Sequence, residues 1–264
     1  MKKLTIALTN GRFGNCMYPL MVGITFANKY NFNNIIVNNH TEIPDLLKND
    51  LKKYYIFTNS TDPLPPLNCF YTCDMDNDLS QFKNYRDLLL GGYLQNSNLI
   101  NEDLCREIIK CPEIDGIIEK NYPSLENYIG LSIRRGDYVG HSIYQTLTKE
   151  FILRMIDKYY KEDKKFIITS DDIEWCKRNL NDLPGNIIFQ DIKENKVLID
   201  WFILTKTKSN ILSCSSFSQS AGLLNPNKHC IVPYPYFKPE SGVTWNDLLV
   251  PNFAIREPLY EEEN

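Results

Sequence analysis

The sequence predicts an α/β protein built on parallel sheets, and two observations support this. Short apolar runs alternate along the chain with longer amphipathic runs, which is the pattern of strands joined by crossover helices. Glycine, serine and asparagine stand where several of the short runs end, as turns between such elements require. With 264 residues, of which 43% are hydrophobic, the chain can bury one large core or two smaller ones.

The first half of the chain opens with a strand, a turn-rich loop and a helix, which is the start of a βα unit. The expected elements are a strand over 4–8, a loop over 9–15, a helix over 17–30, strands over 35–37 and 88–94, and a helix over 102–110. The prolines within 62–66 indicate a loop-rich region before the third of these strands.

The second half repeats the alternation more regularly. The expected strands cover 128–133, 166–169, 187–189 and 210–213, and the expected helices cover 148–161, a segment that begins at 172 or 173, 197–205, and a segment after the last strand. The Asn-Tyr-Pro-Ser run at 121–124 separates the two halves. We therefore expect an N-terminal domain over 1–123 and a C-terminal domain over 124–264.

The charge and the apolar runs argue against two classes of protein. A net charge of −4 argues against nucleic-acid binding by bulk electrostatics, so any phosphate contacts are local. No apolar run approaches the ~18–20 residues of a membrane span, and the N-terminal run is too short for a signal peptide. We expect a cytoplasmic protein, in which the sequons at Asn39 and Asn59 are chance matches.

The eight cysteines show neither a metal-binding nor a disulfide pattern. No Cys-x-x-Cys occurs, and His40, His141 and His229 lie far apart in the sequence. We expect free, mostly buried thiols and no bound metal.

The adjacent pair Arg134 and Arg135 directly follows the expected strand over 128–133. Ligands of open α/β sheets bind at the ends of strands, and the planar guanidinium fork matches phosphate oxygens two at a time. The pair therefore favours a phosphate site, such as one for a nucleotide diphosphate. A solvated surface turn is the alternative, and Arg-Gly-Asp at 135–137 is a chance match to an adhesion tripeptide.

Three further polar loops stand at the ends of expected elements. Residues 169–172 (Thr-Ser-Asp-Asp) offer either a helix cap or ligand contacts, and so does the serine-rich run over 213–222. The loop over 11–15 (Gly-Arg-Phe-Gly-Asn) resembles a nucleotide turn, but it is neither a dinucleotide fingerprint nor a Walker loop.

Two single residues are weaker candidates. Asp200 is a carboxylate on an otherwise apolar helix, where it can accept paired donors from guanine or simply face solvent. His141 follows the arginine loop closely enough to act as a general base, although a lone histidine is more often neither base nor ligand.

Five motifs in order along the chain resemble the α1,2-fucosyltransferases of glycosyltransferase family 11 and, more distantly, the α1,6- and protein O-fucosyltransferases. They are Gly-x-x-Gly-Asn-x-Met over 11–17, Gly-Tyr-Leu-Gln over 92–95, Arg-Arg-Gly-Asp-Tyr over 134–138, Ser-Asp-Asp over 170–172 with Trp175, and Ser-Ser-Phe-Ser over 215–218. Three positions depart from the family pattern: Ser132 stands for His, Cys16 for Gln and Cys214 for Asn.

The resemblance implies a GT-B fold, with two Rossmann-like domains facing a cleft, and a metal-independent inverting transfer of L-fucose from GDP-fucose to a glycan hydroxyl, such as the 2-OH of a galactoside. It implies that Arg134 and Arg135 grip the diphosphate and that either Asp137 or His141 is the base, with Asp137 favoured. The substrate-binding residues that it implies are Gly11, Arg12, Phe13, Gly14, Asn15, Ser170, Asp171, Asp172, Asp200, Ser215, Ser216, Phe217, Ser218 and Gln219. The expected partners are this nucleotide sugar and a glycan acceptor, with no cofactor.

Two alternatives remain open at this point. The three departures allow a related transferase that uses a different nucleotide sugar, or a protein that binds glycan or GDP without catalysis. The acceptor glycan and the oligomeric state are not encoded in any motif of the sequence.

Overall fold

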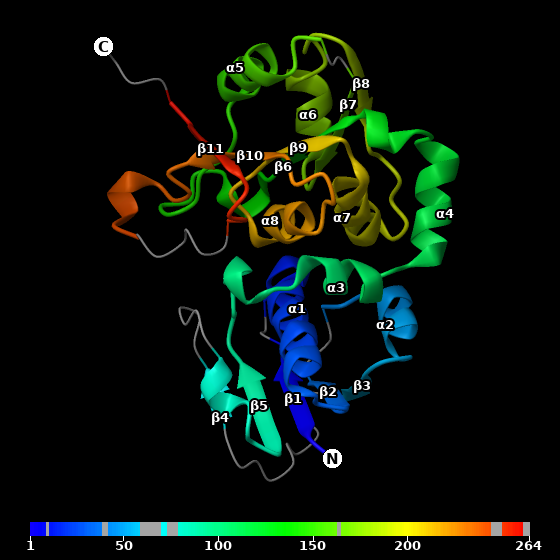
Figure 1. Ribbon diagram of the computed structural model, residues 1–264. Coiled ribbons are helices and arrows are strands. Elements are labelled where there is room, and N and C mark those ends of the chain that lie inside the picture. The colour runs from blue at the N-terminus through cyan, green and yellow to red at the C-terminus, as the bar shows by residue number, and fades with distance from the viewer. Residues whose placement is uncertain are drawn as a thin grey trace. The chain divides into compact units, whose positions relative to one another are not determined.

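The computed structural model describes residues 1–8, 11–38, 42–58, 70–72, 79–162, 165–243 and 250–260, the segment 70–72 by its backbone alone. These residues form two compact units, Met1–Pro112 and Glu113–Asn264, and each unit is built on a parallel sheet with helices against it (Figure 1). The α/β class is confirmed.

The sheet of the first unit has the described strand order β3-β2-β1-β5-β4, and every neighbouring pair is parallel. Its strands are β1 (Lys3–Ala7), β2 (Asn34–Asn38), β3 (Ile56–Thr58), β4 (Phe70–Thr72) and β5 (Asp87–Gly91). The order reverses between β1 and β5, which places the loops after these two strands at one edge of the sheet.

The long helix of the first unit follows β1 directly and packs against β1 and β5. The helices are α1 (Phe13–Tyr30), α2 (Asp45–Leu51) and α3 (Glu102–Ile108), with short 3-10 turns η1 (Ser80–Phe82) and η2 (Ser97–Leu99). Gly23 lets α1 approach the sheet closely, because a Cβ atom there would lie 2.1 Å from Ile6 Cδ1.

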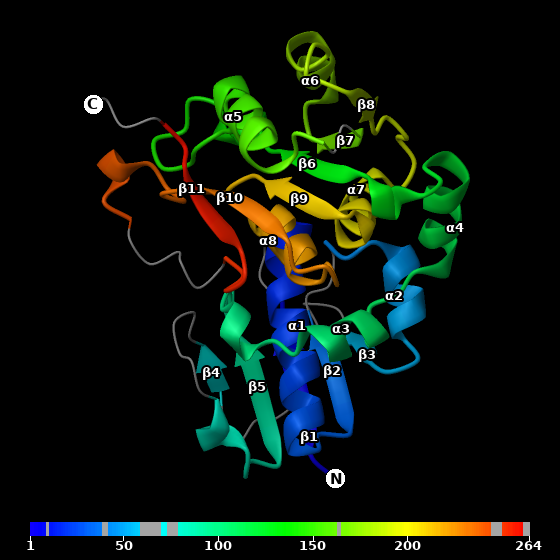
Figure 2. The ribbon, with the colours of Figure 1, turned by 45° about the horizontal axis from the view of Figure 1, so that its top comes forward.

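The sheet of the second unit has the described order β11-β10-β9-β6-β7-β8, again with parallel pairs throughout (Figure 2). Its strands are β6 (Ile129–Ile133), β7 (Lys165–Ser170), β8 (Asn186–Phe189), β9 (Ser209–Leu212), β10 (Cys230–Tyr234) and β11 (Ile255–Pro258). Counted from β6, this is the Rossmann order 3-2-1-4-5-6, and it reverses between β6 and β9.

Helices cover both faces of this second sheet, α5 and α6 on one face and α7 and α8 on the other (Figure 1). The helices are α4 (Pro112–Asn121), α5 (Lys149–Tyr159), α6 (Ile173–Asn179), α7 (Lys196–Lys206) and α8 (Ser216–Leu223), with 3-10 turns η3 (Leu125–Asn127), η4 (Gly136–Tyr138) and η5 (Pro239–Ser241).

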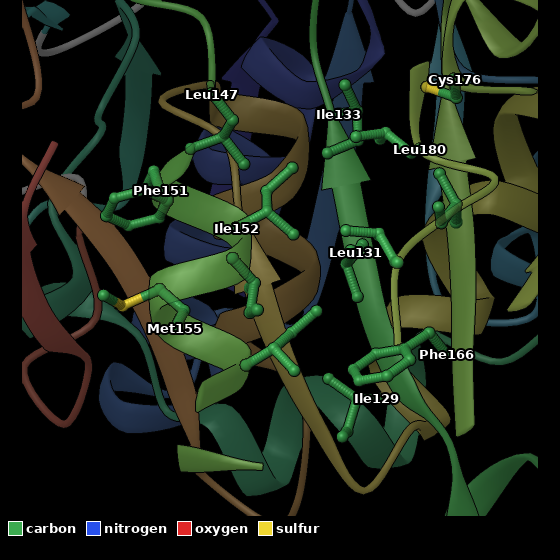
Figure 3. Packing of buried hydrophobic residues seen from close by; sticks show 14 of the residues in the cluster. Ile129, Leu131, Ile133, Leu147, Phe151, Ile152, Met155, Phe166, Cys176 and Leu180 are labelled. Atoms are coloured by element: carbon green, nitrogen blue, oxygen red, sulfur yellow. The ribbon is translucent and has the colours of Figure 1, made fainter. Parts of the chain in front are cut away.

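Strand β6 shows how alternation of side chains builds these two faces. Ile129, Leu131 and Ile133 join a buried apolar cluster under α5 and α6 (Figure 3). The side chains between them point to the other face. There Ser132 contacts α8, and Gly130 allows close packing, because a Cβ atom at Gly130 would lie 2.2 Å from the side-chain oxygen of Asn210.

The structure differs from the sequence prediction in several elements. Helix α1 begins at Phe13, so part of the expected loop over 9–15 is helical, and β5 ends at Gly91, before Leu94. The sequence gave no signal for β3, β4, β10, β11, α2 or α4, which are short or not strongly patterned. The two units divide between Pro112 and Glu113, which leaves most of α4 in the second unit, whereas the sequence boundary was placed at 123.

The expected free thiols are found at the six cysteines that the structure describes, all of them buried. Cys69 and Cys73 lie outside the described residues, as do His40 and the two sequons. In the described part of the chain, no helix is long and apolar enough to cross a lipid bilayer.

Candidate active site

The candidate site of the second unit lies at the carboxyl ends of β6, β7 and β9, where the strand order reverses. Open parallel sheets bind their ligands at this position. Three loops meet there: 134–138 after β6, 171–172 after β7 and 213–215 after β9. Direct hydrogen bonds join them, because Arg134 N donates to Ser213 Oγ over 2.8 Å and Arg135 N donates to Asp171 Oδ1 over 2.8 Å.

Arg134 has two carboxylate partners. Its Nη1 lies 2.8 Å from Asp171 Oδ2, and its Nη2 donates to Asp137 Oδ1. Its guanidinium carbon also lies 5.1 Å from the ring centre of Tyr138, within cation–π range. Asp171 therefore bridges the two arginines, accepting a backbone N–H from one and a side-chain N–H from the other.

Arg135 has a different environment. Its guanidinium carbon lies 3.6 Å from the ring centre of Trp175 on α6, and its Nε lies 3.6 Å from Asp172 Oδ2. That nitrogen is buried and has no hydrogen-bond partner among the described residues. Arg135 thus carries donors that the described part of the protein leaves unused.

A glycine makes the bridging position of Asp171 possible. A Cβ atom on Gly136 would lie 2.5 Å from Asp171 Oδ2, closer than any such contact can be. The glycine in Arg-Arg-Gly-Asp therefore serves the placement of a carboxylate that comes from the next strand.

The Ser-Asp-Asp loop divides its side chains between capping and the arginines. Asp172 Oδ1 accepts from Trp175 N over 3.1 Å and so caps α6, while Ser170 Oγ accepts from Asp172 N over 2.9 Å. The capping interpretation thus describes Ser170 and one oxygen of Asp172. Asp171 is used on the arginines instead.

The serine-rich loop after β9 forms a buried chain of hydroxyl groups. Ser218 Oγ lies 2.6 Å from Ser132 Oγ and 2.8 Å from Ser215 Oγ, and Ser215 Oγ also accepts from Ser218 N, which caps α8. Gln219 is buried and donates from Nε2 to Ser213 O over 2.9 Å. These groups hold the loop together.

Ser216 and Phe217, in contrast, are half-buried at the start of α8. Of the residues predicted in this loop, they are the ones whose side chains reach the surface of the second unit.

Asp200 is buried, with 6% of its surface exposed, so the solvent-facing alternative is wrong. Its Oδ2 lies 2.5 Å from Lys196 Nζ, and its Oδ1 accepts from Gln190 Nε2 over 2.6 Å. Burial raises the pKa of this carboxyl, and the contacts with Lys196 and Gln190 oppose that shift. Each oxygen keeps a further lone pair that can accept a ligand donor.

Gln190 is a residue that sequence reasoning missed. It is fully buried and accepts from Tyr122 Oη over 3.0 Å, while it donates to Asp200. It directly follows β8, and a polar residue at a strand end was the signal that could have found it.

The two candidate bases differ in availability. His141 Nδ1 accepts from Ile143 N over 3.0 Å, so the neutral ring holds its proton on Nε2. The Asp137 side chain is 50% exposed and bonds to Arg134. The geometry favours Asp137 over His141 as a proton acceptor.

The first unit has its own polar loops, after β1 and β5. Gln95 Nε2 donates to Asn15 Oδ1 over 2.9 Å, which joins the Gly-Arg-Phe-Gly-Asn and Gly-Tyr-Leu-Gln motifs. A Cβ atom on Gly11 would lie 2.5 Å from Asn15 Nδ2. Phe13 and Gly14 are buried in α1.

Arg12 is exposed, and Gly11 and Asn15 are partly exposed. Thr9 and Asn10 lie outside the described residues.

No group of three or more histidine, cysteine, aspartate or glutamate side chains is arranged to hold a metal ion in the part of the chain that the structure describes. The sequence also contains Asp74 and Asp76, an Asp-x-Asp pair outside those residues.

Two Rossmann-like units, one with a cationic loop at its switch point, define the GT-B architecture of nucleotide-sugar transferases. A solved structure supports this fold: Arabidopsis thaliana FUT1 mutant R284K in complex with GDP matches with a TM-score of 0.58 and 11% identity. The match covers 91% of this chain and 72% of that one.

The chain belongs to glycosyl transferase family 11, whose sequence model matches residues 70–241. Among curated relatives, the O-antigen biosynthesis glycosyltransferase WbnK of Escherichia coli is 26% identical over 69% of this chain. An alpha-1,2-colitosyltransferase of Escherichia coli is 33% identical over 43% of it, and the galactoside 2-alpha-L-fucosyltransferase SEC1 of Bos taurus is 27% identical over 37%. These matches cover 59%, 42% and 28% of the respective relatives.

Proposed function

We propose that this protein transfers L-fucose from GDP-fucose to a hydroxyl group of a glycan, with the 2-OH of a galactoside as the acceptor position. The observation that carries the proposal is the arginine pair at the β6–β9 switch point, with the donors of Arg135 left unused. Family membership supports fucosyl transfer, and relatives named as α1,2-glycosyltransferases and galactoside fucosyltransferases support the linkage.

The reaction is a direct displacement with inversion. The acceptor oxygen forms a bond to C1 of the β-linked fucose while the bond from C1 to the β-phosphate oxygen breaks, and the sugar becomes α-linked. Negative charge develops on the departing GDP. A preorganised donor at such a position contributes about 3–4 kcal/mol to the transition state, and Arg135 is placed to supply it.

The proton of the acceptor hydroxyl passes to a carboxylate in this proposal. Asp137 is half-exposed and lies next to the arginines, which makes it the candidate base. Asp200 would accept the ring N–H and exocyclic amine of guanine, with Gln190 and Lys196 fixing its orientation.

The proposed transfer needs no metal, because guanidinium groups supply the positive charge at the leaving group. Nucleotide sugar and glycan are the proposed partners of the site, and a cytoplasmic location is the setting in which GDP-fucose would be met.

A ligand panel followed by product analysis tests the proposal. GDP-fucose should raise the unfolding temperature more than GDP-mannose or uridine diphosphate sugars do. Incubation of GDP-fucose with an array of β-galactosides should then give an α1,2-linked product, identified by NMR. Stronger stabilisation by a uridine compound would overturn the choice of donor. Binding without any product by mass spectrometry would favour a glycan- or GDP-binding protein.

A second donor is favoured by one specific observation. The relative with 33% identity is named an alpha-1,2-colitosyltransferase, and colitose is L-fucose without its 3-hydroxyl group. The departures at Ser132, Cys16 and Cys214 also change the surroundings of the motifs. Competition between GDP-fucose and GDP-colitose in a single transfer reaction separates the two donors by the mass of the product.

A further inference from the structure

We propose that Trp175 is a positioning residue for the diphosphate: its indole ring fixes the plane of the Arg135 guanidinium, so that the unused N–H groups of Arg135 are already oriented when the nucleotide sugar binds. The inference rests on the proposed function, since it concerns how that site holds its donor. The stack at 3.6 Å is the observation that carries it.

The sequence places Trp175 under Arg135 by two independent local effects. Arg135 continues the parity of Ile129, Leu131 and Ile133, the residues of β6 that face α5 and α6. Trp175 lies in the first turn of α6, which the Asp172 carboxylate caps. Strand parity and helix capping therefore bring the two side chains to the same place.

Trp175 is itself anchored. One side of the residue packs against the buried apolar cluster of the second unit, and the side chain also contacts the guanidinium of Arg135. A side chain that is held by the core loses little further freedom when it orients a neighbour, so the order is present before the ligand arrives.

Stacking leaves the in-plane donors of a guanidinium available. The ring of Trp175 contacts the face of Arg135, whereas guanidinium N–H groups lie in the plane and point away from that ring. The in-plane donors of Arg134 are instead engaged by Asp137 and Asp171. Asp172 lies 3.6 Å from Arg135 Nε, too far for a strong hydrogen bond.

A purely structural role for Trp175 makes a different prediction, and two variants separate the roles. Trp175→Phe keeps an aromatic face, and Trp175→Leu keeps apolar volume without that face. Both should unfold within about 2 °C of each other if packing is matched. Relative to wild type, Trp175→Leu should lower kcat/KM for the donor and the affinity for GDP about 5- to 30-fold, whereas Trp175→Phe should change them less than about 3-fold.

A thermodynamic cycle tests whether Trp175 acts through Arg135. In an Arg135→Lys background, which lacks the planar group, Trp175→Leu should change the affinity for GDP less than about 2-fold. Equal GDP affinities for the Phe and Leu variants, or an undiminished effect in the lysine background, would overturn the positioning role.

A spectroscopic measurement tests the stack without any turnover. The Nε–H resonance of Arg135, assigned through Arg135→Lys, should show a ring-current shift in the wild type and in Trp175→Phe, and lose it in Trp175→Leu. Absence of the shift in the wild type would overturn the inference. If GDP binds but no fucose is transferred, the proposed function fails while the affinity series and this resonance still decide the role of Trp175.

Discussion

The two units place polar loops at the same position of their sheets but fill them with opposite chemistry. In the first unit the strand order reverses between β1 and β5, and the loops there are joined by the neutral amides of Asn15 and Gln95. In the second unit it reverses between β6 and β9, and the loops carry two guanidinium groups among carboxylates and hydroxyls. Amides match neutral hydroxyl groups, and guanidinium groups match phosphate.

A shared device makes the comparison sharper. In each unit a glycine leaves room for a polar side chain that crosses over it: Asn15 over Gly11, and Asp171 over Gly136. The first is a contact within one loop, whereas the second joins loops that follow different strands. The second unit therefore depends more strongly on its sheet to keep the site assembled.

The largest effect is expected from removing the arginine with unused donors. Arg135→Ala should reduce transfer by about 10²–10³-fold or more, because the charge on departing GDP loses a preorganised donor. The unfolding temperature should stay close to that of the wild type, since the side chain lies at the surface of the unit. Initial rates with GDP-fucose and a thermal melt measure both, and retained turnover would contradict the assigned role.

The next effect tests the glycine device in the second unit. Gly136→Ala should displace Asp171 and lower kcat/KM for the donor about 10-fold, with little change in stability. Gly116→Ala, in α4, is the matched control, because a Cβ atom there meets nothing within 4 Å. Steady-state kinetics of the two variants should differ, and similar values would show that the bridge is dispensable.

A smaller effect is expected from the amide pair of the first unit. Asn15→Ala and Gln95→Ala should each weaken transfer several-fold while leaving the affinity for GDP unchanged, as befits a loop that meets neutral groups. The double variant should reveal a coupling of about 0.5–1.5 kcal/mol from their shared hydrogen bond. Calorimetric titration with GDP provides the control, and a large loss of GDP affinity would contradict the division between the units.

The smallest effect is expected from removing divalent cations. Exhaustive treatment with EDTA should change the initial rate less than about 2-fold, because the arginines carry the positive charge at the leaving group. A rate that falls and is restored by Mg²⁺ or Mn²⁺ would instead direct attention to Asp74 and Asp76.

The sequence predicted the fold best where patterns were long and repeated. The apolar runs at β1, β6, β7 and β9 and the amphipathic α5 were identified to within a few residues. Strands β3 and β4 have three residues each, too few for any period to show. The start of α1 was placed too late because glycine and asparagine in 11–15 indicate a turn, and burial against the sheet overrides that preference.

The candidate site was predictable in its residue types but not in its contacts. Motif order located Arg134, Arg135 and Asp171, since each follows a strand of the same sheet. Which carboxylate pairs with which arginine depends on side-chain geometry across loops, and so does the stack on Trp175. Gln190 escaped notice because a single polar residue after β8 carries no pattern of its own.

The loops around Arg134 and Arg135 contain one more carboxylate than guanidinium groups, with Asp137, Asp171 and Asp172 already in place. A diphosphate entering this cluster exchanges with resident anions instead of filling a bare cationic pocket. The same anions return as the product departs and compete for Arg134, which limits how long GDP is retained. Turnover, not tight capture, is the property that such an arrangement serves.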